Sequence, residues 1–213
     1  MTDKTIVHVM RHGEVHNPDK ILYGRLPGYR LSDLGERMAK TAAEWLAGRD
    51  VTLLLTSPLE RAVQTAQPVA EVFGLEPRTD ERLIESANHF EGRTVAGGWR
   101  SFTDREALKQ LKNPFEPSWG EPYAETAKRM LSVVTDARDE AAGHEAVLVS
   151  HQLPIYVLRR FVEGRRLWHR PDRRQCGLAS ITTLTWDGAR LASVTYAEPA
   201  GELTRQAAAT PGA

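Results

Sequence analysis

The sequence lacks the features of a secreted, membrane-spanning or nucleic-acid-binding protein. It has a single cysteine, Cys176, which excludes an internal disulfide and favours a reducing compartment. No apolar run approaches the roughly 18 residues that cross a bilayer, and the apolar stretch before Arg11 is too short for a signal peptide. Its 28 basic and 28 acidic residues give a net charge of zero, which points to neither a nucleic-acid nor a membrane partner. The sequence therefore predicts a cytoplasmic protein.

Apolar, β-branched runs alternate with helical patterns along the chain. Residues 5–10, 51–56 and 146–150 are typical of buried strands, and helical spacing covers 32–48, 57–74, 124–141 and 153–163. In the second helix, Ser57 is the expected N-cap and Pro58 the first helical residue. Two alternating runs around Asp187-Gly188 predict a hairpin. This order predicts an α/β fold, a three-layer sandwich whose mostly parallel central sheet is flanked by helices on both faces.

The length fits a single domain, residues 1–200, and we find no internal repeat. Residues 86–123 are irregular and are expected to form an inserted segment over the site. Residues 201–213, mostly Ala, Gly, Thr and Pro, are predicted to be a disordered tail. The hairpin offers an edge through which a homodimer would form, although the sequence does not decide this.

Polar side chains stand at the ends of the predicted strands. Arg11 and His12 end the first strand, His151 ends the third, and Arg61 lies about one turn inside the helix after the second. Because strand tips and helix N-termini of an α/β sheet meet at one edge, we expect these groups to converge on a phosphate-like oxyanion. Each residue alone also has a structural interpretation, a hydrogen-bonded histidine or a solvated arginine.

Five segments carry a more specific signal. In chain order they are Arg11-His12-Gly13-Glu14, Leu31-Ser32-Asp33-Leu34-Gly35, Ser57-Pro58-Leu59-Glu60-Arg61-Ala62-Val63-Gln64-Thr65-Ala66, Arg82-Leu83-Ile84-Glu85 followed by Glu91-Gly92, and Leu148-Val149-Ser150-His151. Together they resemble the motifs of the histidine phosphatase superfamily, in its phosphoglycerate mutase-like branch. One short triplet would be a weak match, whereas five ordered motifs are specific.

The resemblance implies a role for each matching residue. His12 would be the nucleophile that accepts the phosphoryl group, and Glu85 would protonate the leaving alkoxide and then activate water. Arg11, Arg61 and His151 would hold the phosphate oxygens. The other positions that the resemblance places around the phosphate are Asn17, Tyr23, Gly24 and Arg25. The family uses no metal or other cofactor, so none is expected.

Two positions depart from the family pattern. Asn17 comes five residues after His12 where the family has six, which leaves its role open. The segment after Glu85 is one residue short of the common spacing, so Glu91 is kept as the alternative acid. Asn88 and His89 are candidates for substrate contact or for ordinary loop residues.

Three functions are compatible with such a site. The first is a phosphatase acting on a small-molecule phosphate ester, the second a 2,3-bisphosphoglycerate-dependent phosphoglycerate mutase, and the third a non-catalytic phosphate-binding module. A mutase must shield its phosphohistidine from water, and the tail from Gly201 offers no apolar anchor for a lid, so hydrolysis is favoured. The binding module is least favoured because every catalytic position is filled.

Two further groups of residues have two interpretations each. The basic loop could recognise a second anionic group of the substrate, but a solvated loop is the safer interpretation; its residues are Arg165, Arg166, Arg170, Arg173 and Arg174. The aromatic residues of the inserted segment would either wall the site or, as we favour, pack the segment on the sheet; they are Phe90, Trp99, Phe102, Phe115, Trp119 and Tyr123.

Overall fold

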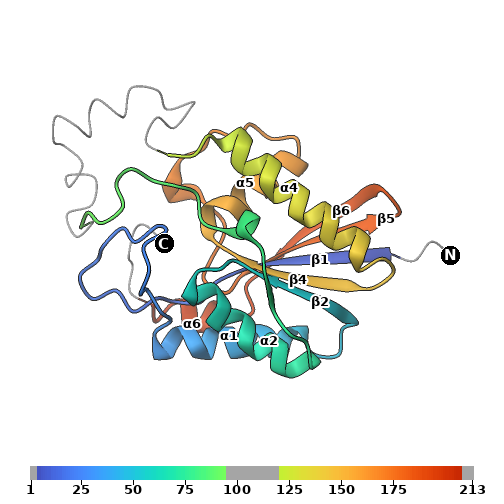
Figure 1. Ribbon diagram of the computed structural model, residues 1–213, viewed down its shortest axis with the longest axis horizontal. Coiled ribbons are helices and arrows are strands. Elements are labelled where there is room, and N and C mark those ends of the chain that lie inside the picture. The colour runs from blue at the N-terminus through green and yellow to red at the C-terminus, as the bar shows by residue number, and fades with distance from the viewer. Residues whose placement is uncertain (1–3, 95–119, 208–213) are drawn as a thin grey trace.

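A mixed six-stranded sheet forms the centre of the protein, as seen in a computed structural model that describes residues 4–94 and 120–207 (Figure 1). The strands are β1 (Lys4–Arg11), β2 (Val51–Thr56), β3 (Arg78–Thr79), β4 (Glu145–Ser150), β5 (Ile181–Asp187) and β6 (Arg190–Ala197). Their order is β3-β2-β4-β1-β5-β6, with β5 antiparallel to both neighbours and the other pairings parallel. The predictions of a mostly parallel sheet and of a hairpin at Asp187-Gly188 are confirmed.

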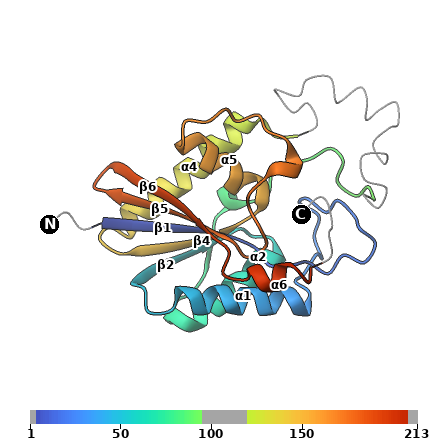
Figure 2. The ribbon, with the colours of Figure 1, turned by 180° about the vertical axis from the view of Figure 1, so that it is seen from behind.

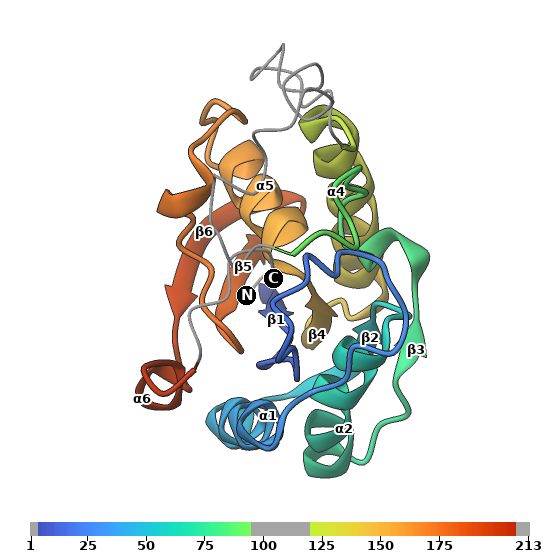
Figure 3. The same cartoon turned by 90° about the vertical axis from the view of Figure 1, so that its left-hand side faces the viewer.

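Helices cover both faces of the sheet, which confirms the three-layer prediction. Helices α1 (Asp33–Leu46) and α2 (Glu60–Phe73) lie on one face, and α4 (Tyr123–Glu140) and α5 (Gln152–Val162) lie on the other (Figures 1 and 3). The side chains of β1 point alternately to the two faces of the sheet and so contribute to the hydrophobic core on each face. Val7 and Val9 pack with α4 and α5, whereas Met10 packs with α1 and α2. The described residues also form two short 3₁₀ helices, η1 (Glu81–Leu83) and η3 (Pro171–Arg173). No helix among the described residues is long and apolar enough to cross a membrane.

The start of α2 differs from the sequence prediction. The helix begins at Glu60 with Leu59 as its N-cap and no side-chain cap, so Ser57 and Pro58 lie outside it. The Ser57 hydroxyl is instead hydrogen-bonded to the ring of His151 at 2.8 Å, a tertiary contact that competes with capping. Arg61 is therefore the second residue of α2, at the edge of the sheet where the sequence places it.

The prediction of a disordered tail from Gly201 is wrong for its first part. Residues Gly201–Thr204 form a short helix, α6, which lies beside α1 (Figure 2). Leu203 and Ala207, four residues apart, pack against the core on this face, and Arg37 donates a hydrogen bond to Gln206. The first part of the tail is therefore held by apolar contacts, which the sequence analysis did not predict. Residues 208–213 lie outside the described part of the chain.

The inserted segment is described only at its two ends. Phe90 and Tyr123 are both buried, as ordinary packing predicts. The other aromatic residues of the segment lie outside the described residues, so its placement over the site stays a prediction; they are Trp99, Phe102, Phe115 and Trp119.

Candidate active site

The strand register brings the two histidines together. Arg11 of β1 pairs with Ser150 of β4, so His12 and His151 leave adjacent strands at the same level. Their ring centroids are 5.1 Å apart, and both side chains are fully buried. In the view toward the carboxyl ends of the strands, the tips of β1 and β4 lie between the two helical layers (Figure 3). The convergence that the sequence predicts at this edge is present.

Two glycines fix the chain immediately after His12. A Cβ atom on Gly13 would lie 2.5 Å from the carbonyl oxygen of Gly35, in the first turn of α1. The backbone N–H of Gly13 donates to Thr65 Oγ1 at 3.1 Å, and the Thr65 hydroxyl donates to the carbonyl of Arg61 at 2.7 Å. The loop at the tip of β1 is therefore tied to both α1 and α2.

The hydrogen bonds of His12 determine which ring nitrogen carries the proton. Nδ1 lies 2.7 Å from the carbonyl oxygen of Gly13, and because a carbonyl can only accept, Nδ1 is the protonated nitrogen. Nε2 is buried and has no hydrogen-bond partner among the described residues. Burial holds the pKa of His12 well below its usual value, and the charges of Arg61 and Arg11 lower it further. His12 thus presents an unprotonated Nε2 atom.

His151 complements this arrangement. Its Nε2 is hydrogen-bonded to Ser57 Oγ, while Nδ1 is buried without a partner in the described part of the chain. Burial, followed by the charge of Arg61, keeps its pKa well below the ordinary value. Two neutral imidazoles therefore lie side by side, each with one ring nitrogen available to a ligand.

The two arginines are anchored through backbone carbonyls. Arg61, 1% exposed, donates from Nη2 to the carbonyl of Gly24 at 2.6 Å and lies 4.8 Å from the centre of the Tyr23 ring. Arg11 donates from Nη1 to the carbonyl of Cys176 at 2.6 Å. A carbonyl orients a guanidinium without neutralising it, so these two contacts position the side chains and leave the guanidinium charges in place.

Glu85 meets the requirement for a proton donor. Burial raises the pKa of its carboxyl, and this effect outweighs the hydrogen bond from the Ser86 N–H and the charges of Arg61, Arg174 and Arg11. Glu91, the alternative acid, is occupied differently: its Oε1 accepts the backbone N–H groups of Arg25 at 3.1 Å and Asn88 at 3.3 Å. The raised pKa of Glu85, which accepts one backbone N–H group where Glu91 accepts two, favours Glu85 as the acid.

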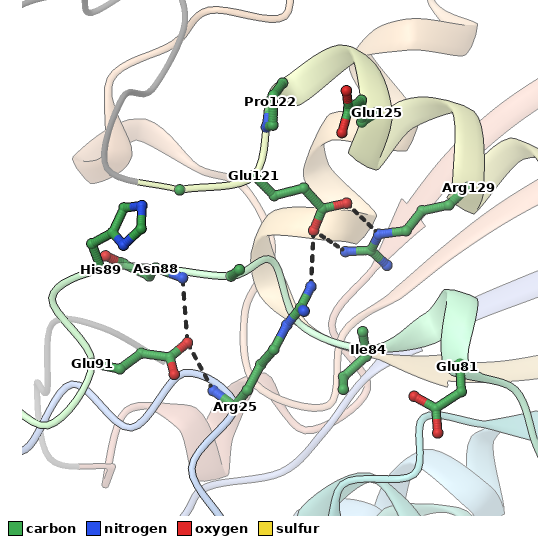
Figure 4. Close-up of a pocket in the computed structure, with 12 residues that line it drawn as sticks. Arg25, Glu81, Ile84, Asn88, His89, Glu91, Glu121, Pro122, Glu125 and Arg129 are labelled. Atoms are coloured by element: carbon green, nitrogen blue, oxygen red, sulfur yellow. Dashed lines mark hydrogen bonds and ion pairs between the residues drawn. The ribbon is translucent and has the colours of Figure 1, made fainter.

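An ion-pair network holds the segment that carries Glu85 (Figure 4). Glu121 receives two hydrogen bonds from Arg129, at 2.6 and 3.0 Å, and one from Arg25 at 3.0 Å. The same two arginines donate to backbone carbonyls of this segment, Arg25 to Glu85 and Arg129 to Arg82, each at 2.6 Å. Glu121 thus fixes two cations that clamp the chain on either side of the proposed acid.

A cavity of about 680 Å³ lies beside this network. Its lining residues come from the Glu85 segment, the Arg25 loop and the start of α4; among them are Arg25, Ile84, Asn88, His89, Glu121 and Glu125. None of the residues that line it is His12, His151, Arg11 or Arg61. The cavity is therefore lined by the residues that hold the Glu85 segment, and not by the two histidines.

The side chain of Asn17 forms its hydrogen bonds with the backbone of its own loop. Its amide donates to the carbonyl of Ile21 at 2.8 Å and accepts the N–H of Ile21 at 3.0 Å, so it closes the loop after β1. A phosphate contact for Asn17 stays a prediction. His89 is exposed, and the side chain of Asn88 accepts the N–H of Phe90 in a local turn.

Sequence reasoning missed several residues that shape the site. Ser57, interpreted as a helix cap, holds His151, and Thr65 links the loop after His12 to α2. Ser57 could have been found because it follows a strand directly, as His12 does. Thr65 lies within the motif that begins at Ser57, although no role was inferred for it, and no local pattern marked the carbonyl of Cys176. Among the residues that the structure describes, no group of three His, Cys, Asp or Glu is arranged to hold a metal ion.

Replacing Glu121 with glutamine should weaken the clamp around Glu85. The change removes the charge shared by Arg25 and Arg129, and we expect it to destabilise the fold by about 1–3 kcal/mol and to lower kcat by about tenfold. Urea denaturation and steady-state kinetics would measure both effects. Glu125→Gln is the matched control, because this exposed glutamate lines the same cavity. Equal effects of the two substitutions would contradict the positioning role.

Acid should destabilise the protein through its buried histidines. Below the ordinary histidine pKa of about 6.5, His12 and His151 take up protons in the unfolded chain but stay neutral in the native protein. Each of the two histidines therefore lowers the free energy of unfolding by up to about 1.4 kcal/mol for every pH unit. The free energy of unfolding should therefore fall as pH drops from about 7.5 to 5.5, and less steeply in His12→Asn. Urea titrations at both pH values test this, and an unchanged slope in the variant would contradict it.

Comparisons with known proteins agree with this geometry. A model of the histidine phosphatase superfamily (branch 1) matches residues 7–199. An uncharacterised protein of Mycobacterium tuberculosis is 54% identical over 200 residues, which are 94% of this chain and 99% of the relative. The probable phosphoglycerate mutase GpmB of Yersinia enterocolitica is 33% identical over 159 residues, 71% of this chain and 72% of that protein. The structure of a mycobacterial glucosyl-3-phosphoglycerate phosphatase has a TM-score of 0.70 and 28% identity, covering 91% of this chain and 96% of that one.

Proposed function

The chain belongs to the histidine phosphatase superfamily, and from this membership we propose that it hydrolyses a small-molecule phosphate ester through a phosphohistidine on His12. The observation that carries the proposal is the state of His12. Its proton is on Nδ1, its pKa is lowered by burial and by two guanidinium groups, and Nε2 has no partner within the described residues. A buried imidazole kept neutral beside two cations is suited to attack a phosphate dianion held by those cations.

In the proposed first step, Nε2 of His12 attacks the phosphorus atom of the bound ester. The N–P bond forms as the P–O bond to the alcohol breaks, and Glu85 gives its proton to the departing oxygen. Arg11 and Arg61 bind the equatorial oxygens, with His151 donating from its free nitrogen. The raised pKa of Glu85 supports this role, since a carboxyl that is protonated nearer neutral pH is a more effective acid there.

In the proposed second step, water displaces His12. The ionised Glu85 takes a proton from the attacking water, the O–P bond forms, the N–P bond breaks and phosphate leaves. His12 and Glu85 return to their starting protonation states, so the cycle balances without a redox partner. The resemblance requires no metal, and the two arginines offset the phosphate charge while the neutral His151 donates a hydrogen bond to it.

A phosphoglycerate mutase is the second candidate. Two findings support the mutase more strongly than the sequence analysis did. They are the similarity to GpmB and the packing of Leu203 against the core, which the predicted disordered tail lacked. The phosphatase stays first because, among the solved structures, the glucosyl-3-phosphoglycerate phosphatase is 28% identical over 91% of the chain, whereas a phosphoglycerate mutase that covers 96% of it is only 18% identical. In a mutase the phosphoryl group of His12 would return to a second hydroxyl of the substrate.

Phosphate release from a panel of esters in the presence of EDTA tests the proposal. The panel contains p-nitrophenyl phosphate, glycerol 3-phosphate and 3-phosphoglycerate, and conversion of 3- to 2-phosphoglycerate with 2,3-bisphosphoglycerate is assayed in parallel. We expect EDTA-insensitive phosphate release and little conversion. Conversion without release would establish the mutase, and neither reaction would overturn both candidates.

A further inference from the structure

One arginine of the basic loop differs from its neighbours. Arg165 pairs with Glu163 and Arg170 with Asp172 on the surface, and Arg173 is exposed, as the solvated-loop interpretation predicts. Arg174 is half-buried and forms no ion pair with a carboxylate of residues 4–94 or 120–207. A guanidinium withdrawn from water without a counter-ion is costly unless something else uses its charge.

The position of Arg174 is fixed by a neutral histidine. Arg174 Nε donates to His169 Nε2 at 2.9 Å, while His169 Nδ1 donates to the carbonyl of Leu167 at 2.7 Å. His169 is 7% exposed and packs between the rings of Tyr123 and Tyr156, with centroids 5.2 and 4.8 Å away. Burial lowers the pKa of His169 to about 4, so the imidazole accepts from Arg174 without cancelling its charge.

Arg174 is also connected to the phosphate site. Its Nη1 approaches Oε1 of Gln152, the residue after His151, at 3.4 Å. The Gln152 amide donates to the carbonyl of Cys176 at 3.5 Å, and the same carbonyl orients Arg11. The charge of Arg174 also acts to lower the pKa of the Glu85 carboxyl, so its electrostatic influence reaches the proposed proton donor.

The charges already around the phosphate suffice for one dianion. Arg11 and Arg61 supply two positive charges, and His12 and His151 are neutral. Arg174 is a third cation beyond this set. We propose, resting on the function proposed above, that Arg174 with Gln152 forms a second anion-binding subsite, so that the preferred substrate is a phosphate ester with another anionic group in its alcohol portion. A carboxylate or a second phosphate offers the paired oxygens that the planar guanidinium fork recognises.

Two matched substrate pairs test this subsite. 3-Phosphoglycerate and glycerol 3-phosphate share a skeleton and differ in a carboxylate, and fructose 1,6-bisphosphate and fructose 6-phosphate differ in a phosphate. The measured quantity is the ratio of kcat/KM within each pair for wild type, Arg174→Gln, Arg174→Lys and Arg173→Gln. Effects on folding or on Glu85 act on both members of a pair, so they cancel in the ratio.

We expect wild type to prefer the member that carries the additional carboxylate or phosphate in at least one pair, which identifies the anionic group. Arg174→Gln should lower that ratio by about 10- to 100-fold, Arg174→Lys by less, and Arg173→Gln should leave it unchanged. A ratio that Arg174→Gln leaves unchanged in both pairs, or no preference in wild type, would overturn the subsite. If wild type hydrolyses none of the four esters, the function proposal fails by itself, and the same ratios are then measured as Kd by calorimetry, where the same criterion decides the subsite.

Discussion

Replacing His12 with asparagine is expected to lower kcat/KM for ester hydrolysis by about 10,000-fold or more. Asparagine can still bond locally in the loop, but it has no ring nitrogen that can take up the phosphoryl group. The arginines and His151 remain, so phosphate should still bind as a competitive ligand. Steady-state kinetics with glycerol 3-phosphate measure the loss, and calorimetry with inorganic phosphate measures the binding.

His16→Asn is the matched control for this substitution. His16 lies four residues further along the same loop, is exposed, and uses its backbone N–H to bond the carbonyl of Arg30. We expect the kcat/KM of the His16→Asn variant to stay within about twofold of the wild-type value, as for most surface substitutions. Residual hydrolysis in His12→Asn near the wild-type rate would exclude His12 as the nucleophile.

Replacing Glu85 with glutamine should produce the second largest loss, and the loss should depend on the leaving group. General acid catalysis contributes about 100- to 10,000-fold, so hydrolysis of glycerol 3-phosphate should fall within that range. The kcat/KM for p-nitrophenyl phosphate, which reports phosphorylation of His12 and not the later attack of water, should fall much less, because nitrophenolate leaves without a proton. Activity in wild type should also decrease as pH rises through the raised pKa of Glu85, and the variant should lose this dependence.

Glu91→Gln distinguishes the two candidate acids. An amide oxygen at position 91 can still accept the N–H groups of Arg25 and Asn88, so the loop should stay in place. We expect no change in leaving-group dependence for this variant. The reverse pattern, with the dependence appearing in Glu91→Gln and absent from Glu85→Gln, would assign the proton to Glu91.

Most of the strands and helices, and the convergence of Arg11, His12 and His151, were predictable for a definite physical reason. Buried parallel strands require continuous apolar runs, and such runs end where the site begins, so Arg11, His12 and His151 could be found by where hydrophobicity stops. The end of α1 and the hairpin turn depend on local sequence and were found in the same way. Local patterns failed at Ser57, where a contact with His151 replaced the expected cap.

The residues that orient the site could not be predicted in this way. Arg25 and Glu121 are 96 positions apart, and no periodicity links them. Arg174 has the same residue type as its exposed neighbours, and only its burial and its contact with His169 distinguish it. The short helix α6 was missed because Leu203 and Ala207 are too few to give a helical signal. Such contacts depend on tertiary packing, which composition does not record.

Trapping the phosphorylated enzyme tests the central claim most directly. Enzyme mixed rapidly with substrate is quenched in alkali, which preserves phosphohistidine, then digested with trypsin and analysed by mass spectrometry. Cleavage after Arg11 and Lys20 releases a peptide that contains both His12 and His16, and fragmentation assigns the modified ring. We predict one phosphoryl group on His12, formed at a rate at least equal to kcat and absent from His12→Asn. Turnover without this species, or a phosphoryl group on another residue, would contradict the account.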